Sequence, residues 1–463
     1  MNIFKKKSLE SVREASSVNS LTKTMGPIDM VLLGLGGIIG SGVFVLTGMV
    51  AAKFAGPAVI ASYIIAGLVC ILVALVYSEL AIFLPTAGSI YTYSYVAFGE
   101  IFAWLTLGVL IGEMCFSSAA VAASWSGYMR GVLVESMGIN IPEALTKIPA
   151  NGGIIDLPAV IITLLVGFIL FFGTKDSKVV NAIFVLIKII VIGVFIASAV
   201  PHFNTNNLEN FMPFGMSGVL QGSSILFFAY TGFGALAAAA EECKNPRRDL
   251  LIGITGSLLL SALLYAIVAV CAVGISPYQD LGNAQPLADA LRRNGSDLGS
   301  LIVGIGAVCG MTTVLMANIY ALSRIFYAIA RDGLLPAAFA KVHPTHHSPY
   351  IGILFLVVWI AIMTGLLPYE DIAQMASMCS LVDYAIVAII AMLFRVRYPD
   401  AYRAFKCPAI FVVAPVAVIA CLYLIATQMF DMETFALTLN GRTFFIWFGV
   451  MLAVYFARKL VRV

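Results

Sequence analysis

Twelve apolar runs, each long enough to cross a lipid bilayer, constrain this chain more than any other feature. A hydrocarbon core of about 30 Å needs roughly 20 apolar residues per helix. We therefore predict an all-α integral membrane protein with 12 transmembrane helices. The predicted spans cover residues 27–52, 57–84, 98–129, 155–173, 179–200, 217–240, 250–275, 299–330, 350–367, 372–394, 409–428 and 443–460.

Composition supports lipid as the surrounding solvent. Apolar residues make up 61% of the chain and charged residues 11%, against roughly 45–50% and about 25% in ordinary globular proteins. The formal net charge of +3 and the lack of a basic, aromatic stripe argue against nucleic-acid binding. The eight cysteines occur singly, without CxxC spacing, so we expect neither a disulfide framework nor a metal site.

Lysine and arginine positions predict the orientation. Residues 1–24 are polar, without the apolar region and cleavage site of a signal peptide, and are expected to form a cytoplasmic tail. With this tail inside, 20 of the 27 basic residues fall in cytoplasmic segments and 6 in outer loops. This bias places both termini in the cytoplasm of a multi-pass cell (inner) membrane protein. The loops are too short for a soluble catalytic domain, so no enzyme and no cofactor is expected.

Glycine-rich stretches interrupt the first and the sixth span. The first contains "GGIIGSG" (Gly36–Gly42) and the sixth contains "FFAYTGFGA" (Phe227–Ala235). Breaks at corresponding positions, five spans apart, indicate a transporter site made by discontinuous helices. Amides at the start of a half-helix attract a carboxylate, and freed carbonyls accept from an ammonium group. The alternative is that these glycines allow close helix packing, which for one segment alone is equally plausible.

Several motifs together resemble the amino acid–polyamine–organocation superfamily, in particular its bacterial members similar to cationic amino acid transporters. They are "GGIIGSGVFVLTG", "SELAIFLPTAGSIYTYSYVAFGE", "ASWSGY", "NAIFVLIK", "FFAYTGFGALAAAAEECKNPRRDL" and "SRIFYAIARDGLLP", within about residues 25–430. The resemblance implies secondary transport of amino acids and a LeuT-like fold with a 5+5 inverted repeat. Residues 25–200 would form one repeat, 201–398 the second, and 399–463 the two appended helices and a short C-terminus.

The resemblance also implies a set of binding residues. The amides of Ser41 and Gly42 would hold the substrate carboxylate. The carbonyls of Ile38, Phe228 and Ala229 would hold its amine. Phe228 would also act as an aromatic lid, and Thr231 would line the side-chain pocket. The full predicted set is Ile38, Gly40, Ser41, Gly42, Glu113, Phe228, Ala229, Thr231 and Gly234.

Charged residues within or beside the spans have two interpretations each. Ionisable groups at membrane depth are functional candidates by default, and for Glu113, which matches a family glutamate near the substrate, function and structure are equally plausible. Structural roles are favoured for Glu79, which would cap or bridge the adjoining loop, and for Asp383, with a gate as the alternative. A cytoplasmic ion-pair network is expected at Glu241 and Glu242, with a latch on the inner gate as the alternative. The histidines in "HPTHH" (343–347) are expected to lie in a plain loop, because no cysteine or carboxylate is near to complete a metal site.

Lys188 is the basic residue that lies deep within a span. Burial disfavours the charged form of lysine, so this side chain could exchange a proton near neutral pH. The resemblance implies that its ammonium takes the place of a coupling cation, against the carbonyls of the first helix. We therefore predict proton-coupled, sodium-independent uptake. The alternative is a static ammonium that only satisfies those carbonyls.

The expected substrate is a neutral, small-to-medium amino acid. Relatives commonly have aspartate where this chain has Gly234, and Glu113, the remaining buried anion of the site, could be balanced by Lys188. An unpartnered cation in such a site would cost several kcal/mol. Cationic amino acids or polyamines, or amino acid exchange, remain the alternative.

A passive channel or a membrane sensor is disfavoured, since no repeated pore ring and no soluble output domain is present. A monomer is expected to suffice for function.

Overall fold

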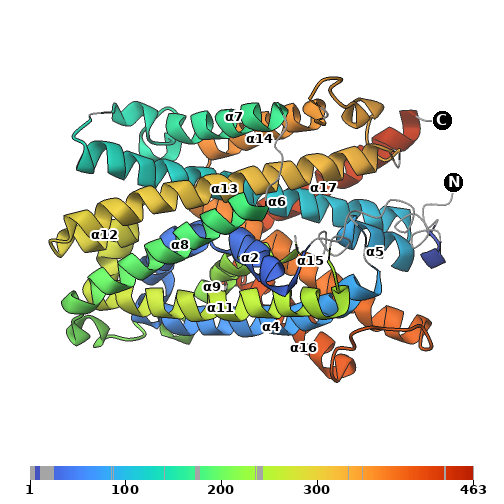
Figure 1. Ribbon diagram of the computed structural model, residues 1–463, viewed down its shortest axis with the longest axis horizontal. Coiled ribbons are helices and arrows are strands. Elements are labelled where there is room, and N and C mark those ends of the chain that lie inside the picture. Colours follow the sequence, from blue (N-terminus) through green and yellow to red (C-terminus); the bar gives the residue numbers. More distant parts are fainter. Residues whose placement is uncertain are drawn as a thin grey trace.

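The computed structural model of the chain is a bundle of helices (Figure 1). It describes residues 6–10, 25–84, 86, 88–139, 141–172, 178–234, 236, 243–331, 333–346, 348–431 and 434–461. Within these residues no β-strand forms, and the β-type pairing is limited to two isolated bridges, Met25 with Cys243 and Phe430 with Leu437. The prediction of an all-α protein is therefore confirmed for the described part of the chain.

The helices follow the predicted apolar runs. In the N-terminal part they are α2 (Pro27–Ile38), the consecutive segments η1 (Gly42–Leu46), α3 (Thr47–Val50) and η2 (Ala51–Ala55), then α4 (Val59–Phe83), α5 (Ser89–Ala97), α6 (Glu100–Arg130) with η4 (Gly131–Ser136), α7 (Leu157–Phe171) and α8 (Lys178–Ala199). In the C-terminal part they are α9 (Gly215–Leu226) with η9 (Phe227–Tyr230), α11 (Pro246–Ile275), η11 (Tyr278–Leu281), α12 (Pro286–Arg293), α13 (Asp297–Arg331), α14 (Tyr350–Leu366), α15 (Tyr369–Arg397), α16 (Ile410–Met429) and α17 (Leu439–Val461).

Eight helical segments in the described residues are long and apolar enough to cross a membrane. They are Gly42–Phe83, Glu100–Glu135, Asn181–His202, Arg248–Ile275, Asp297–Arg331, Tyr369–Arg397, Ile410–Met429 and Leu439–Arg458. Three shorter apolar helices, α2, α7 and α14, have 12, 15 and 17 residues. At about 1.5 Å per residue, these three are shorter than a bilayer core. The protein is thus a multi-pass membrane protein, while the count of twelve spans stays a prediction.

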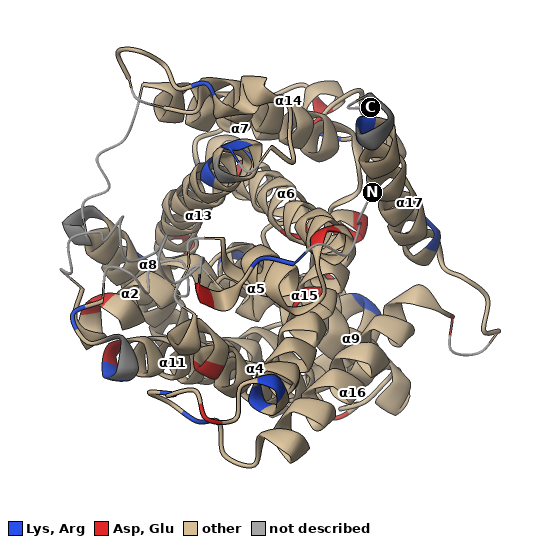
Figure 2. Cartoon of the chain, turned by 90° about the vertical axis from the view of Figure 1, so that its right-hand side faces the viewer, with Lys and Arg blue, Asp and Glu red and all other residues tan. Residues whose placement is uncertain are grey.

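The two broken segments lie inside the bundle. Helix α11 packs against both α2 and α4, α8 packs against α2 and α13, and α6 packs against α13 and α15. Helices α7 and α14 pair with each other on one side of the bundle, beside α6 and α13 (Figures 1 and 2). Lys, Arg, Asp and Glu at the viewed end lie mostly in helix ends and connecting segments (Figure 2).

Opposite ends of the bundle carry different features. Residues 6–10 and the C-terminal end of α17 lie at one end (Figure 1), where the Lys7 ammonium stands 5.1 Å from the centre of the Tyr95 ring. Helix α12 lies at the other end (Figure 1).

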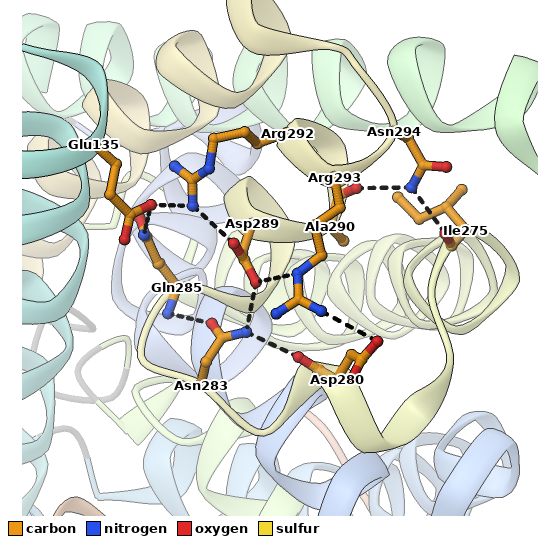
Figure 3. Close-up of polar contacts among 10 residues, drawn as sticks. All are labelled: Glu135, Ile275, Asp280, Asn283, Gln285, Asp289, Ala290, Arg292, Arg293 and Asn294. Carbon is orange, nitrogen blue, oxygen red and sulfur yellow. Dashed lines mark hydrogen bonds and ion pairs between the residues drawn. The ribbon is translucent and has the colours of Figure 1, made fainter.

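A network of ion pairs holds α12 (Figure 3). Arg292 contacts Glu135, in η4, and also Asp289 at 2.7 Å. Arg293 contacts Asp289 at 2.9 Å and Asp280, in η11, at 3.1 Å. Arg292 and Arg293, which the sequence places in an outer loop, thus attach α12 to η4, the continuation of α6, and to η11.

Candidate functional site

The first helix is broken at the predicted glycines. Helix α2 ends at Ile38, and Ile39 has an extended backbone with φ −75° and ψ 100°. Helical geometry resumes at Ser41 and continues from Gly42 to Ala55. The predicted residues Ile38 and Gly40 therefore lie at the end of α2 and within the break, while Ser41 and Gly42 begin the second half, which we call the resumed helix.

The sixth segment is broken in a different way. Helix α9 tightens into the 3-10 turn η9, which contains Phe228 and Ala229. Thr231 is then extended, with ψ 160°, and Gly232 has φ +109°. This φ lies in the region that glycine adopts readily and other residues do not. The Thr231 hydroxyl donates to the Phe228 carbonyl at 2.8 Å, so the predicted pocket residue holds the turn in place.

The two breaks are in direct contact. A Cβ placed on Gly232 would lie 2.7 Å from the carbonyl oxygen of Gly37, and one on Gly42 would lie 2.5 Å from the Cβ of Ala229. Neither position has room for a side chain, so glycine here permits two backbones to approach closely. The glycine-rich stretches therefore both break the helices and allow them to pack closely, while a binding site at the breaks stays a prediction.

Tyr265 joins the carbonyl groups at the two breaks. Its hydroxyl, from α11, lies 2.9 Å from the Ile38 carbonyl oxygen and 3.1 Å from that of Ala229. A hydroxyl has one proton to donate, so it serves one of these acceptors at a time. Tyr265 was not among the predicted residues, because in the sequence it is only one polar tip within the apolar run "SALLYAIVAV".

Lys188 contacts the first broken helix. Its side chain is fully buried in α8, and its ammonium donates to the Gly36 carbonyl at 2.9 Å. The aliphatic stem packs against α13, because a Cβ on Gly310 would lie 3.1 Å from Cγ of the lysine. The ammonium therefore stands between the first broken helix and α13.

Glu113 faces α15 and not Lys188. Groups on α15 close enough to interact with its carboxyl include Ser380, Cys379 and Asp383. Asp383 is 3% exposed, and one of its carboxylate oxygens has no hydrogen-bond partner in the described residues. The expectation that Lys188 balances Glu113 finds no contact there, because α8 and α6 present these side chains to different neighbours. The two membrane-depth carboxyls, on α6 and α15, are close enough to influence each other electrostatically.

Glu79 joins three segments at the end of α4. Its carboxylate, 3% exposed, contacts both Arg395, with one distance of 2.9 Å, and Arg403 at 3.2 Å. It also accepts from the Cys407 amide at 2.7 Å. Burial, together with the nearby Glu79 carboxylate, raises the pKa of the Cys407 thiol to about 11. Glu79 thus has a structural role, as favoured from the sequence, but it bridges α4 to α15 and to the loop before α16 and not to the adjoining loop after α4.

Of the other charged and histidine residues named from the sequence, some lie within the described residues and some outside them. The rings of His343 and His346 stack 4.7 Å apart beside Phe171. The described residues contain no group of three or more His, Cys, Asp or Glu arranged to hold a metal ion. Glu241, Glu242 and His347 lie outside the described residues. Gly234 is described, and a Cβ there would lie 3.6 Å from the Tyr77 hydroxyl.

A bundle of apolar helices, with two broken helices in contact at its centre, has the architecture of a membrane transporter. The chain belongs to the amino acid permease family, whose model matches residues 25–456. It is similar to a branched-chain amino acid permease of Bacillus subtilis, with 37% identity over 98% of this chain and 97% of the relative. It is equally similar to a methylthioribose transporter of the same organism, with 37% identity over 98% and 97%. A mouse cationic amino acid transporter 4 is 37% identical over 84% of this chain and 63% of its own length.

Proposed function

We propose that this amino acid permease is a secondary active transporter that takes up neutral, small-to-medium amino acids with protons. The observation that carries the proposal is the contact between the two helix breaks, which brings backbone acceptors and donors to one place. An amino acid zwitterion offers its ammonium group to the acceptors and its carboxylate to the donors. Its ammonium would be held by the carbonyls of Ile38, Phe228 and Ala229. Its carboxylate would be held at the resumed helix, by the amides of Ser41 and Gly42.

The proposed architecture is the LeuT-like one. Residues 25–200 and 201–398 would form the two inverted repeats, with residues 399–463 appended and residues 1–24 as a tail. The breaks in the first and sixth predicted spans support this arrangement, because they occupy corresponding places in the two repeats. The bias of 20 basic residues against 6 supports cytoplasmic termini in the cell membrane.

Lys188 would bind the transported proton. Its ammonium bonds the Gly36 carbonyl at 2.9 Å, so the protonated side chain stabilises α2 next to its break. Loss of the proton would weaken this charge-assisted hydrogen bond and so loosen the hold on the carbonyl. The first broken helix could then move relative to α8 and α13, which would open the site inward. Protonation from outside and release inside would couple the proton gradient to uptake.

The absence of a fixed charge at Gly234 favours neutral substrates. The Glu113 carboxyl lies beside Ser380 on α15, and we expect it to be directed away from the breaks. The side chain of the substrate would lie near Thr231 and under Phe228, which is apolar and 5% exposed. The Bacillus subtilis relative named a branched-chain amino acid permease agrees with this choice.

Uptake into proteoliposomes tests the proposal. Labelled leucine is offered at two external pH values, with and without sodium, and with excess alanine, arginine, putrescine or methylthioribose. We expect concentrative uptake that needs an inward proton gradient, does not need sodium, and is inhibited best by alanine. Stronger inhibition by arginine would support the cationic alternative. Equilibration without accumulation under every gradient would indicate a passive channel or an exchanger.

A further inference from the structure

A crevice lies between α6, α15 and α17, three helices that pack against one another, with α17 at the edge of the bundle (Figure 2). Its volume is about 300 Å³. One wall runs along α6 from Phe98 to Val109, and the opposite wall includes Ile386 and Ile389 of α15 and Phe448 of α17. Protein interiors are close-packed, with few voids larger than a water molecule, so a space of this size has room for a ligand.

The walls of the crevice are apolar. Seven of its eight lining residues have hydrocarbon side chains, and the eighth is Thr106. The Thr106 hydroxyl is already bonded to the Phe102 carbonyl at 2.8 Å and to the Ser94 hydroxyl at 2.9 Å. Water in a buried site needs about two to four polar partners, and these walls do not supply them. The crevice therefore fits an apolar ligand.

The crevice opens sideways, toward lipid. At its mouth Phe102 is 44% exposed and Ile389 is 41% exposed, whereas Val109 is fully buried at its floor. Phe102 and Ile389 belong to helical segments that are long and apolar enough to cross a membrane. Their exposed surface therefore faces the acyl chains of the bilayer, which can enter the crevice from the side.

The crevice has about the length of one leaflet. On α6 it extends from Phe98 to Val109. On α15 it begins at Ile386, near the middle of the helix, and the helix continues to Arg397. At about 1.5 Å per residue, each of these stretches is about 16 Å long, close to half of a hydrocarbon core of about 30 Å. A molecule that runs along the crevice from the end of α15 thus reaches the middle of the bilayer, as the acyl chain of a phospholipid does.

A positive charge stands at the end of the crevice near the membrane surface. Arg397, the last residue of α15, is exposed, and its guanidinium donates to the Ala97 carbonyl at 2.6 Å. Ala97 precedes Phe98, where the crevice begins, so the guanidinium and the crevice are adjacent. A guanidinium has five N–H donors and pairs well with phosphate. Glu100, in the first turn of α6, is bonded instead by the Tyr455 hydroxyl at 3.3 Å. An anionic headgroup therefore has a partner here.

We propose that the crevice binds one acyl chain of an anionic phospholipid of the membrane, with the phosphate group paired to Arg397. The bound chain fills the space between α6, α15 and α17 and stabilises their contact, since each buried CH₂ group contributes favourably. Basic groups near a membrane surface favour anionic over neutral lipids. The site lies outside the two breaks and does not depend on which substrate is carried.

Binding of defined lipids to the purified full-length protein tests this site. Palmitoyl-oleoyl phosphatidylglycerol is compared with palmitoyl-oleoyl phosphatidylcholine, which has the same chains and a headgroup without net charge. Native mass spectrometry gives the dissociation constant of the first bound lipid. Ile389→Trp and Leu105→Trp each fill the crevice with an indole ring, from opposite walls, and Arg397→Gln removes the charge. Ile362→Trp, at an exposed apolar position of α14, and Arg442→Gln, exposed in the first turn of α17, are the matched controls.

We expect the wild type to bind phosphatidylglycerol at least about fivefold more tightly than phosphatidylcholine, the size of effect that one basic residue has at a membrane surface. Arg397→Gln should bring the two affinities within about twofold, and each crevice-filling variant should weaken the binding of both lipids by about tenfold or more. The controls should behave as the wild type, and size-exclusion profiles establish that each variant is folded. Equal wild-type affinities for the two lipids, or a preference that persists in Arg397→Gln, would overturn the phosphate contact. Unchanged binding in the crevice-filling variants would overturn the acyl-chain site.

Discussion

The carbonyl oxygen of Gly36 accepts a 2.9 Å hydrogen bond from the buried ammonium of Lys188. This contact joins α8 to α2 two residues before the end of α2. It links the charge state of one side chain to the stability of the break. If the lysine loses its proton, the bond loses its charge-assisted part, and charge-assisted bonds are about twice as strong as neutral ones.

Lys188→Ala should therefore abolish concentrative uptake while leaving substrate binding measurable. The variant keeps the breaks but removes the proton-binding group. Uptake driven by an imposed pH gradient should fall to the level of empty liposomes, while leucine counterflow without a gradient should persist. Lys53→Ala, which changes a lysine that is half-exposed, serves as the control and should keep most of the gradient-driven uptake. Uptake by Lys188→Ala with an unchanged pH profile would contradict the coupling role.

Gly232→Ala should destabilise the protein and impair transport. The backbone there has φ +109°, and a left-handed conformation costs a non-glycine residue roughly 1–2 kcal/mol. A Cβ would also lie 2.7 Å from the Gly37 carbonyl oxygen, so the two breaks would have to separate. Thermal unfolding in detergent measures the loss.

Gly193→Ala is the matched control for this substitution. Gly193 lies in α8, and a Cβ there meets nothing within 4 Å. Alanine should therefore stabilise this helix by up to about 1 kcal/mol. Equal melting temperatures for both variants would show that Gly232 has no special backbone requirement.

The breaks could be predicted from the sequence because their cause is local. Glycine weakens a helix wherever it stands, and the run Gly36–Gly42 concentrates four glycines where α2 ends. The apolar runs likewise predict helices, since a helix forms its backbone hydrogen bonds within its own segment. These features need no knowledge of which helix lies beside which.

The partners of buried polar groups could not be predicted in this way. Tyr265 meets Ile38 across 227 positions of the chain, and Gln285 meets Glu135 across 150. Such pairs depend on how each helix is rotated about its axis. For the same reason the sequence marked Lys188 and Glu113 as buried charges but could not show that they face different helices. The number of spans is also hard to read from helix lengths, because a broken span such as the first forms two shorter helical pieces.

Tyr265→Phe should lower stability and increase the stabilisation given by substrate. Removing the hydroxyl leaves the carbonyls of Ile38 and Ala229 without their donor, at a cost of about 1–3 kcal/mol. A bound ammonium would replace that donor, so leucine should raise the melting temperature of the variant more than that of the wild type. Tyr423→Phe, at an exposed position of α16, is the control. A smaller leucine shift in Tyr265→Phe would mean that the substrate does not reach these carbonyls.

Glu79→Gln should weaken the contact between α4 and the loop before α16. The carboxylate pairs with Arg403, whose side chain is 2% exposed, and removing one partner of a buried pair typically costs about 3–5 kcal/mol. The Cys407 amide would also lose part of its acceptor, and the thiol, 3% exposed, would become more accessible. Maleimide modification of Cys407, followed by mass spectrometry of its peptide, should speed up. Asp400→Asn, an exposed carboxylate of the same loop, should leave the rate unchanged.

Gly234→Asp should shift selectivity from neutral toward cationic amino acids. A Cβ at this position would lie 3.6 Å from the Tyr77 hydroxyl, an ordinary contact, so the backbone need not move to admit a Cβ. The carboxylate would give a cationic side chain the partner that this site lacks, and an unpaired charge there costs several kcal/mol. Arginine should then inhibit labelled leucine uptake at least about tenfold better than in the wild type, a change of about 1.4 kcal/mol. Gly234→Asn has nearly the same shape without the charge and should keep the wild-type order of inhibitors. If both variants change the order alike, the size of the residue at 234 determines selectivity and its charge does not.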